Sequence, residues 1–393
     1  MSVSRSVAIV GIAEAQLENG KLPLGETVLQ IQAKMAKQAL DDAGFTKDDV
    51  NGLFVAGAWG IPGPGIIGSG IVPTLTLSEY LGIKPGYAES TQIGGASFEA
   101  HVGHAAAAMQ AGLCDVALVL FGSTQRSEKL RTMKKPAALT DQYESVWGLP
   151  SPLGSYALAA QRHMFEYGTT SEQLAEIAVS AREWAKLNPN ATKRESLTVK
   201  DVLESPLIAD PLHILDCCLV TDGAGALVLA STERARDSKR KPVWLLGYGE
   251  SQTHLSIGQM PDLTITPAKD SGKRAFGMAG VSHEEIDLLE IYDSFTITVL
   301  LTLESLGFCA PGEGGSFVSN QRTAPNGSLP MNTNGGGLSY AHPGMFGIFL
   351  LIEAVRQLRG EAGERQVNNA KLALVNGTGG VLSSSVTCIL GRN

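Results

Sequence analysis

The sequence predicts an α/β protein made of two similar halves, in which helices pack against the faces of β-sheet. The first observation is a phrase that occurs twice: AGFTKDDVNGLFV at 43–55 and AGVSHEEIDLLEI at 279–291 share Ala-Gly, a hydroxyl residue, two acids and an apolar strand. The second is that short apolar runs alternate with longer segments of helical period along nearly the whole chain. A unit repeated at an offset of 236 residues predicts a duplicated fold.

Composition favours a compact enzyme. Of 393 residues, 44% are hydrophobic, 18% are charged and 45 are glycine, which is typical of a globular, loop-rich chain with room for two or three domains. The net charge of −8 argues against a nucleic-acid surface, because phosphate binding needs clustered lysine and arginine. The one basic cluster, at 129–135, fits a solvated loop as well as a contact to a phosphate-bearing ligand.

Cysteine use and the lack of long apolar runs in the sequence indicate a cytoplasmic protein. The five cysteines have neither CxxC spacing nor the pattern of a secreted disulfide framework. They are expected to be reduced thiols, and no metal site is expected. The N-terminus MSVSRSVAIVGIAEAQ is interrupted by Glu14 and fits a first strand better than a signal peptide. No run approaches the roughly 18 apolar residues that a membrane span needs.

In the first half, strands are expected to alternate with helices, and glycines mark the stops and close approaches. The expected elements are a strand and a turn at 6–16, a helix at 26–43 that stops at Gly44, a short acidic connection and a second strand within 43–57, a glycine-rich loop at 52–70, an Ala-rich helix opened by small residues at 94–97, and a buried strand at 114–123.

Composition changes at 124–212, where amphipathic helices with charged residues replace buried strands, and we expect an insertion that covers the site. Buried-strand composition returns at 216–231 and closes the first half. The second half repeats the scheme. The expected division is 1–123 with 213–240 as the N-terminal half, 124–212 as the insertion, and 241–393 as the C-terminal half.

Reactive side chains gather in two stretches of the second half. In LLEIYDSF at 288–295, a buried strand ends abruptly at Tyr292. In GGGLSYAHPG at 335–344, Tyr340 and His342 lie in a glycine-rich loop that leads into an apolar helix. Backbone N–H groups at such a helix start stabilise developing negative charge. We expect the chemistry at these two stretches.

These motifs, in their order, resemble the thiolase superfamily, in the branch associated with sterol carrier protein. The resemblance rests on GGASFEAHVGHAAAAMQAG, QRHMFEYGTT, DCCLVTDGAGALVL, YDSF, GGGLSYAHPG and NGTGG, which together span nearly the whole chain. It implies a thiolase fold, with two similar halves in a five-layered α-β-α-β-α arrangement and a helical insertion. It also implies an acyl-CoA substrate, with coenzyme A as part of that substrate and no cofactor in this chain.

The sequence departs from thiolases at both catalytic cysteines. Thiolases have a nucleophilic cysteine at the start of the central N-terminal helix, where the helix dipole lowers the thiol pKa. Here Gly95 lies at or beside that position. A second cysteine normally opens a Cys-x-Gly-Gly turn, which here is 377–380. Tyr292 replaces the histidine that heads the YDSF motif in thiolases, whereas the His-Pro histidine remains as His342. Covalent acyl transfer through these two thiols is therefore lost.

These departures resemble the thiolase-fold aldolases of bacterial steroid side-chain degradation, often called lipid-transfer proteins. Such enzymes cleave a β-hydroxyacyl-CoA by a retro-aldol reaction and work with a small partner that has an OB fold and a zinc ribbon. Their two active-site tyrosines match Tyr292 and Tyr340. The resemblance implies a homodimer core that binds two copies of the partner in a heterotetramer.

The resemblance also implies a role for each site residue. Tyr292 and Tyr340 would act as base and acid, in either order, on the β-hydroxyl group and the enolate. His342 would orient a tyrosine or donate to the enolate oxygen. The predicted oxyanion-binding loop consists of Gly95, Gly379 and Gly380.

Simpler interpretations stay open beside these roles. A tyrosine at a strand end is commonly a core aromatic residue, and Asp293 fits a loop-capping role as well as one that supports catalysis. His101 and His104 fit packed or interface residues, and Cys217 and Cys218 fit structural thiols. Two other functions also stay open: a cysteine-less Claisen-type acyltransferase on acyl-CoA, and a non-catalytic acyl-CoA or lipid-binding subunit.

Overall fold

A computed structural model describes residues 3–23, 25–56, 73–128, 141–149 and 152–392. The basic cluster at 129–135 and most of the glycine-rich loop at 52–70 lie outside these ranges. The strands are β1 (Val7–Glu14), β2 (Gly52–Val55), β3 (Tyr87–Ser90), β4 (Val116–Ser123), β5 (Leu207–Ala209), β6 (Leu212–His213), β7 (Gly223–Ser231), β8 (Val243–Gln252), β9 (Leu288–Ile291), β10 (Leu372–Gly379) and β11 (Ser384–Gly391). The α-helices are α1 (Val28–Ala43), α2 (Pro73–Leu81), α3 (Ser97–Gln110), α4 (Asp141–Glu144), α5 (Leu153–Tyr167), α6 (Ser171–Leu187), α7 (Val199–Glu204), α8 (Ala268–Ala279), α9 (Thr296–Leu306), α10 (Gly314–Val318) and α11 (Gly347–Arg359).

Nine strands form one sheet in the order β3-β2-β4-β7-β1-β8-β11-β10-β9. Apart from β3, the order is symmetric, because β2-β4-β7-β1 on one side corresponds to β9-β10-β11-β8 on the other. The two sides meet where β1 pairs with β8 through Ala8–Trp244 and Ile9–Val243. β2 and β4 are parallel, as are β9 and β10, and β7 and β11 run antiparallel to both of their neighbours. The prediction of two similar halves is confirmed.

Equivalent residues pack the outer helix on the sheet in each half. A Cβ added to Gly11 on β1 would clash with the Ala39 carbonyl oxygen of α1. In the same way, a Cβ added to Gly247 on β8 would clash with the Ala275 carbonyl oxygen of α8. Both pairs of positions differ by the 236 residues of the repeated phrase. In each half, a glycine lets the outer helix pack directly on the strand.

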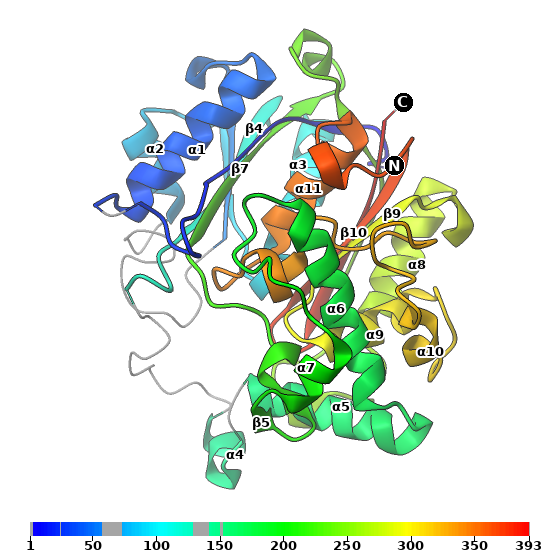
Figure 1. Cartoon of the computed structure of the whole chain (residues 1–393). Helices are drawn as coiled ribbons and strands as arrows, with labels where there is room; N and C mark the ends of the chain where they lie inside the picture. Colours follow the sequence, from blue (N-terminus) through cyan, green and yellow to red (C-terminus); the bar gives the residue numbers. More distant parts are fainter. Residues whose placement is uncertain (1–2, 24, 57–72, 129–140, 150–151, 393) are drawn as a thin grey trace.

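Helices form three layers around the two halves of the sheet (Figure 1). α1 packs on β1, β4 and β7, and α8 packs on β8 and β11. α3 and α11 contact each other and strands of both halves, so they form the middle layer. A helix that is enclosed on both sides needs an apolar surface nearly all round. In α11, residues 347–355 are all buried. The five-layered arrangement is therefore confirmed.

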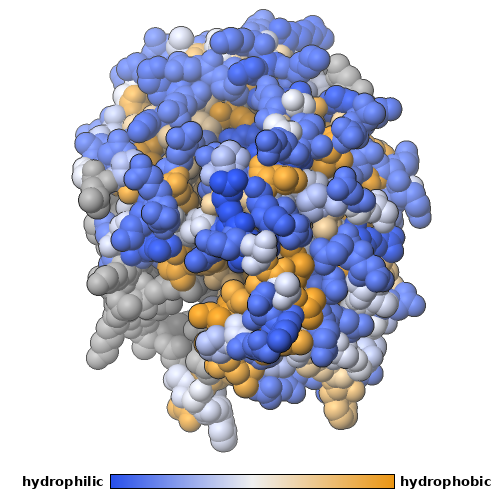
Figure 2. Space-filling model, viewed as in Figure 1, coloured by the Kyte–Doolittle hydropathy of each residue, from blue (hydrophilic) through white to orange (hydrophobic). Residues whose placement is uncertain are grey.

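The chain between β4 and β7 includes α5, α6, α7 and the small β5–β6 pair. α5 and α6 pack on α9, and α6 also packs on α10 (Figure 1). Tyr143, Trp147 and Phe165 are exposed here, and Figure 2 shows hydrophobic residues gathered on the lower part of one face. The boundaries of the insertion at 124–212 stay a prediction. Within the described ranges, no helix has the length and apolar character of a membrane span.

Candidate active site

The start of α3 is made of glycines. Residues 94–96 form a short 3-10 turn that leads directly into the helix, and Gly94 has a φ of +69°, which favours glycine. A Cβ on Gly94 would lie 2.6 Å from the backbone nitrogen of Gly380. The turn after β10 therefore packs directly on the helix start, which places the predicted Gly95 and Gly380 at one site.

Tyr292 follows β9 and lies across this helix start. Its N–H donates to the Asn376 carbonyl at 3.0 Å, which anchors it beside β10, and its side chain is 4% exposed. A Cβ on Gly95 would lie 2.5 Å from the Tyr292 hydroxyl oxygen and closer still to the ring carbons. The phenol ring therefore fills the space that a side chain at position 95 would need.

His342 contacts the Tyr292 hydroxyl. The distance from Tyr292 Oη to His342 Nε2 is 2.9 Å, and the two rings are nearly perpendicular at 88°. The imidazole lies at 25° to the ring of Phe346, and the backbone N–H of His342 donates to Thr221 Oγ1 at 3.0 Å. These contacts fix the imidazole so that it can exchange a proton with the phenol.

Asp293 holds the loop that contains Tyr340 and His342. Its buried carboxylate accepts hydrogen bonds from the N–H groups of Gly337 at 2.7 Å and Leu338 at 3.2 Å, within the π-helical turn 336–340. Burial raises the pKa of Asp293 to about 7, although these N–H donors act in the opposite direction. These contacts support the loop-holding role for Asp293.

Tyr340 is buried at the end of the same turn, but its hydroxyl has a different partner. It hydrogen-bonds to the carboxylate of Glu14, at the end of β1, and Glu14 also pairs with Arg356 Nη1 at 2.5 Å. Phe346 contacts the rings of both tyrosines, with centroid separations of 6.1 Å to Tyr292 and 6.4 Å to Tyr340. The two tyrosines thus belong to one aromatic cluster, whereas their hydroxyls face different groups.

The turn after β10 is held from two sides. Gly379 packs on the Ile93 carbonyl oxygen, where a Cβ would clash, and Gly380 has a φ of +63°. On the other side, Tyr156 of α5 donates to the Gly380 carbonyl at 3.2 Å. The sequence did not indicate Tyr156, because a tyrosine on an amphipathic helix gives no sign that it reaches the end of a distant strand. The only signal was its position in the segment expected to cover the site.

Burial controls the protonation of the site. It raises the pKa of Tyr292 and of Tyr340 well above the ordinary tyrosine value, and the negative charge of Glu14 adds to the effect on Tyr340. Both phenols are therefore protonated at neutral pH. Cys218 also raises the pKa of Tyr292, so its thiol lies near the phenol. The sequence had favoured a structural role for Cys218.

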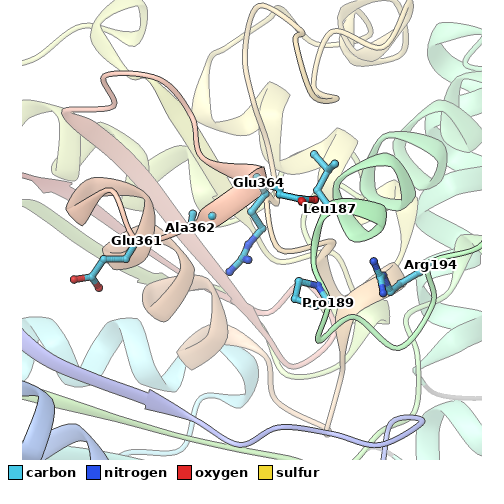
Figure 3. A pocket seen from close by; sticks show the side chains of 8 residues that line it. Leu187, Pro189, Arg194, Glu361, Ala362 and Glu364 are labelled. Atoms are coloured by element: carbon cyan, nitrogen blue, oxygen red, sulfur yellow. The ribbon is translucent and has the colours of Figure 1, made fainter.

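Within the described ranges, no group of three or more His, Cys, Asp or Glu side chains could hold a metal ion. A hollow of about 440 Å³ is formed by the loops that follow α6 and α11, where Leu187, Pro189, Arg194 and residues 361–365 line it (Figure 3). It adjoins the C-terminal end of α11, whereas His342 precedes the N-terminal end. A 13-residue helix is about 20 Å long, so this hollow is separate from the site.

Comparisons with known proteins place these features in a family. Residues 249–392 match the family described as "Thiolase C-terminal domain-like". The chain is 31% identical to an acetyl-CoA acetyltransferase of Methanothermobacter thermautotrophicus, over 99% of this chain and 100% of that protein. It is 32% identical to the 17-hydroxy-3-oxo-4-pregnene-20-carboxyl-CoA lyase of Mycobacterium tuberculosis, over 96% of this chain and 97% of that protein. It is 31% identical to a steroid side-chain-cleaving aldolase of Thermomonospora curvata, over 95% of each.

Solved structures agree with these sequence similarities. The Ltp2-ChsH2(DUF35) aldolase superposes with a TM-score of 0.88 at 30% identity, covering 100% of this chain and 99% of that one. Human mitochondrial 3-ketoacyl-CoA thiolase in complex with CoA superposes with a TM-score of 0.72 at 17% identity, covering 100% and 99%. The second similarity shows the fold alone.

Proposed function

This chain belongs to the thiolase superfamily, and we propose that it is an aldolase that cleaves a β-hydroxyacyl-CoA, of the steroid side-chain type, to a ketone and a shortened acyl-CoA. The observation behind the proposal is that the Tyr292 ring fills the side-chain space of Gly95, with its hydroxyl 2.9 Å from His342. A phenol–imidazole pair thus stands at the N-terminus of α3, where thiolases have a thiol. Two relatives whose names describe carbon–carbon cleavage support this function.

The proposed reaction breaks one carbon–carbon bond and, through two proton-transfer steps, moves one proton in net terms from oxygen to carbon. A base removes the proton of the β-hydroxyl group, whose oxygen becomes the ketone carbonyl. The electron pair of the Cα–Cβ bond passes to Cα and forms the thioester enolate. An acid then protonates Cα. The proton lost from oxygen is replaced on carbon, so no oxidant, reductant or water is consumed.

Tyr292 and His342 are proposed to perform one of these two proton transfers. A buried neutral phenol is a weak base, because burial disfavours its charged form. An imidazole at 2.9 Å removes this obstacle, since it takes the phenol proton while the phenol oxygen accepts the proton of the substrate. The reverse path lets the same pair deliver a proton to Cα.

Tyr340 is proposed to perform the other proton transfer. Its hydroxyl donates to the carboxylate of Glu14, which is held by Arg356. Glu14 can therefore accept or return the proton of Tyr340. The shared contact with Phe346 keeps Tyr340 close to the Tyr292–His342 pair.

The enolate oxygen is proposed to lie against backbone N–H groups of the glycine turns. Gly95 lies in the turn that leads into α3, where the helix dipole favours negative charge, and Gly379 and Gly380 pack against this turn. A preorganised donor of this kind contributes roughly 3–4 kcal/mol to the stability of the transition state.

For assembly, we propose a homodimer core with two copies of a small OB-fold and zinc-ribbon partner. The solved Ltp2-ChsH2(DUF35) aldolase is named for two proteins, which supports a partner of the DUF35 type. β3 is an edge of the nine-stranded sheet and has alternately exposed residues, so this edge is proposed to pair with a second copy of the chain. A cytoplasmic location is proposed with this function.

Acyl transfer is the second candidate function. An acetyl-CoA acetyltransferase is as similar to this chain as the aldolases are, and the Cys218 thiol lies near Tyr292. A covalent acyl group on Cys218 would then replace the retro-aldol step.

The test is incubation of the protein with a β-hydroxyacyl-CoA bearing a steroid side chain, with and without the DUF35-type partner. Ketone and shortened acyl-CoA in stoichiometric amounts support the aldolase. Acyl exchange between two CoA thioesters, with no ketone, supports the second candidate. Binding of the thioester with no product under either condition would make the chain a non-catalytic acyl-CoA-binding subunit.

A further inference from the structure

A buried carboxyl group lies behind the site, and the proposed mechanism does not use it. Glu99 is on α3, one helical turn after Gly95, and its side chain is fully buried. Among the described residues, neither of its carboxyl oxygens has a hydrogen-bond partner. A buried polar group without a partner opposes folding, so an apolar residue here would be more stable. Its presence therefore points to a role other than packing.

Two glycines make room for the Glu99 carboxyl group. A Cβ on Gly347, the first residue of α11, would lie 2.7 Å from Glu99 Oε1 and would also clash with the Gly95 carbonyl oxygen. A Cβ on Gly377 of β10 would lie 2.6 Å from Glu99 Cδ. The carboxyl group thus occupies a slot between α3, α11 and β10, directly beside the backbone of Gly95.

Few titratable groups surround this slot in the described part of the chain. α11 and β10 contribute Gly347 and Gly377 to it, and the charge of Glu99 acts on Tyr292, after β9, and on Cys388 of β11. The Cys388 thiol also donates to the Glu99 carbonyl at 3.7 Å. His342 is connected to the slot through Tyr292.

Of the three groups Glu99, Tyr292 and Cys388, Glu99 is the first to lose its proton as the pH rises. Burial raises the pKa of Glu99 to about 8, and it raises the pKa values of Tyr292 and Cys388 well above their ordinary values near 10 and 9. Within the slot, the change of charge between pH 7 and 9 therefore comes from Glu99, whereas Asp293, on the loop side of Tyr292, has a pKa of about 7 and completes most of its ionisation below pH 8.

We propose that Glu99 is a positioning residue that sets the alkaline limit of turnover by controlling the charge behind Tyr292. The proposal rests on the proposed function. A protonated Glu99 leaves the site neutral, whereas an ionised Glu99 places a negative charge beside the phenol and the enolate. That charge opposes both a phenolate at Tyr292 and the enolate of the substrate. Turnover is slowed whether Tyr292 acts as the base or as the acid.

The first test is the pH profile of kcat/KM between pH 6 and 10. The wild-type value should fall about tenfold from pH 7 to pH 9, because a single ionisation centred near pH 8 leaves about one molecule in ten protonated at pH 9. Glu99→Gln keeps the shape of the side chain and is neutral at every pH, so the kcat/KM of this variant should change less than twofold from pH 7 to pH 9. His101→Gln is the matched control, since His101 is fully buried on the same helix and burial lowers its pKa to about 3. This control should keep the wild-type fall.

The second test does not depend on activity, and its first measurement needs no variant. The carboxyl carbon of Glu99 is followed by carbon-13 NMR in the wild-type protein, and it should titrate near pH 8. In addition, the ultraviolet signal of the Tyr292 phenolate, taken as the difference from Tyr292→Phe, should appear at lower pH in Glu99→Gln than in wild type. A Glu99 carboxyl already ionised at pH 6, or a Glu99→Gln variant with the wild-type pH profile, would overturn the proposal. If no β-hydroxyacyl-CoA is cleaved, the proposed function fails while these two titrations still decide the charge of Glu99.

Discussion

The ring of Tyr292 and the Cα of Gly95 are packed so closely that no side chain at position 95 fits while the ring is in place. A thiol at position 95 and a phenol at position 292 therefore exclude each other. One packing contact accounts for both departures from the thiolase pattern that the sequence shows at these positions, the missing cysteine and the additional tyrosine.

Gly95→Ala should destabilise the protein by about 1–3 kcal/mol, the usual cost of overpacking, and should abolish the Tyr292–His342 contact. In a Tyr292→Ala background the added methyl group has room, so the same change should cost much less. Denaturant unfolding of the four proteins of this double-mutant cycle measures the coupling, which is expected at about 0.5–3 kcal/mol. Additive costs would show that the ring moves aside freely.

Tyr292→Phe keeps the ring but removes the hydroxyl, so stability should fall by only about 0.5–1.5 kcal/mol. Turnover should fall by about 10²–10⁴, the contribution of a positioned acid or base, while CoA-thioester binding stays within a few-fold. Tyr248→Phe is the matched control, because Tyr248 packs on Gly103 of α3 as Tyr292 packs on Gly95, and its hydroxyl donates to Glu250 at 2.7 Å. Normal turnover of Tyr292→Phe would make Tyr292 a core aromatic residue.

Tyr340→Phe tests the second proton transfer in the same assay. We expect a loss of turnover of about 10²–10⁴ if Tyr340 exchanges a proton with the substrate. The loss of its hydrogen bond to Glu14 should cost about 0.5–1.5 kcal/mol of stability. Wild-type turnover in this variant would assign Tyr340 to the core and leave Tyr292 and His342 as the only proton-transfer pair.

No covalent acyl-enzyme should form on any of the five cysteines during turnover. Cys218→Ser should keep near wild-type activity, and so should the protein after thiol alkylation. Intact-protein mass spectrometry with acyl-CoA provides the measurement, and Cys217→Ser is the neighbouring control. A stable acyl adduct on Cys218 would favour the acyltransferase over the aldolase.

His104 should stabilise the protein in a limited pH range. Hydrogen bonds to Glu250 and Glu89 raise the pKa of His104 to about 9, so its contribution is complete below the unfolded pKa of about 6.5 and is lost as the pH rises through 9. The same contacts lower the pKa values of both carboxyl groups to about 2, and that contribution is lost only in strong acid. The difference in melting temperature between wild type and His104→Gln should therefore be largest near pH 6 and vanish above pH 9. An equal difference in melting temperature near pH 6 and above pH 9 would contradict a stabilising ion pair at His104.

The chain should be a dimer at micromolar concentration, measured by light scattering after gel filtration. The open edge at β3 provides backbone groups for pairing with a second copy. Addition of the DUF35-type partner should raise the mass by two partner copies per dimer. A stable monomer at this concentration would contradict both the dimer and the binding of two partner copies per dimer.

The sequence predicted the duplicated fold well, because repetition and strand composition are local signals. β2 and β9 begin at equivalent positions within the repeated phrase. The helix expected at 26–43 is observed at Val28–Ala43, and it ends at Gly44, which has a left-handed φ of 81°. The joining of the two halves through β1 and β8 was not predicted, because pairing between distant strands leaves no local pattern.

The candidate site was predicted in part, and the limits have physical causes. Motif order indicated Gly95, Tyr292, His342 and the glycine turn, and these lie together in the structure. Hydroxyl direction depends on side-chain rotamers, so the contact of Tyr340 with Glu14 was not visible in the sequence. Glu99 was missed because a single acid in an Ala-rich helix resembles a solvent-exposed residue until its burial is known.

The two equivalent strands β2 and β9 are followed by different residues. The residue after β2 is Ala56 and the residue after β9 is Tyr292, and these positions are equivalent in the repeat. Ala56 is buried in the same core cluster as Tyr292 and offers no functional group. The first half supplies the helix start at Gly95, and the second half supplies the phenol, the imidazole and the glycine turn. The proposed reaction centre therefore draws on both halves of the chain. Neither half alone would contain both the helix start and the Tyr292–His342 pair, and the symmetry of the repeat is broken at Tyr292.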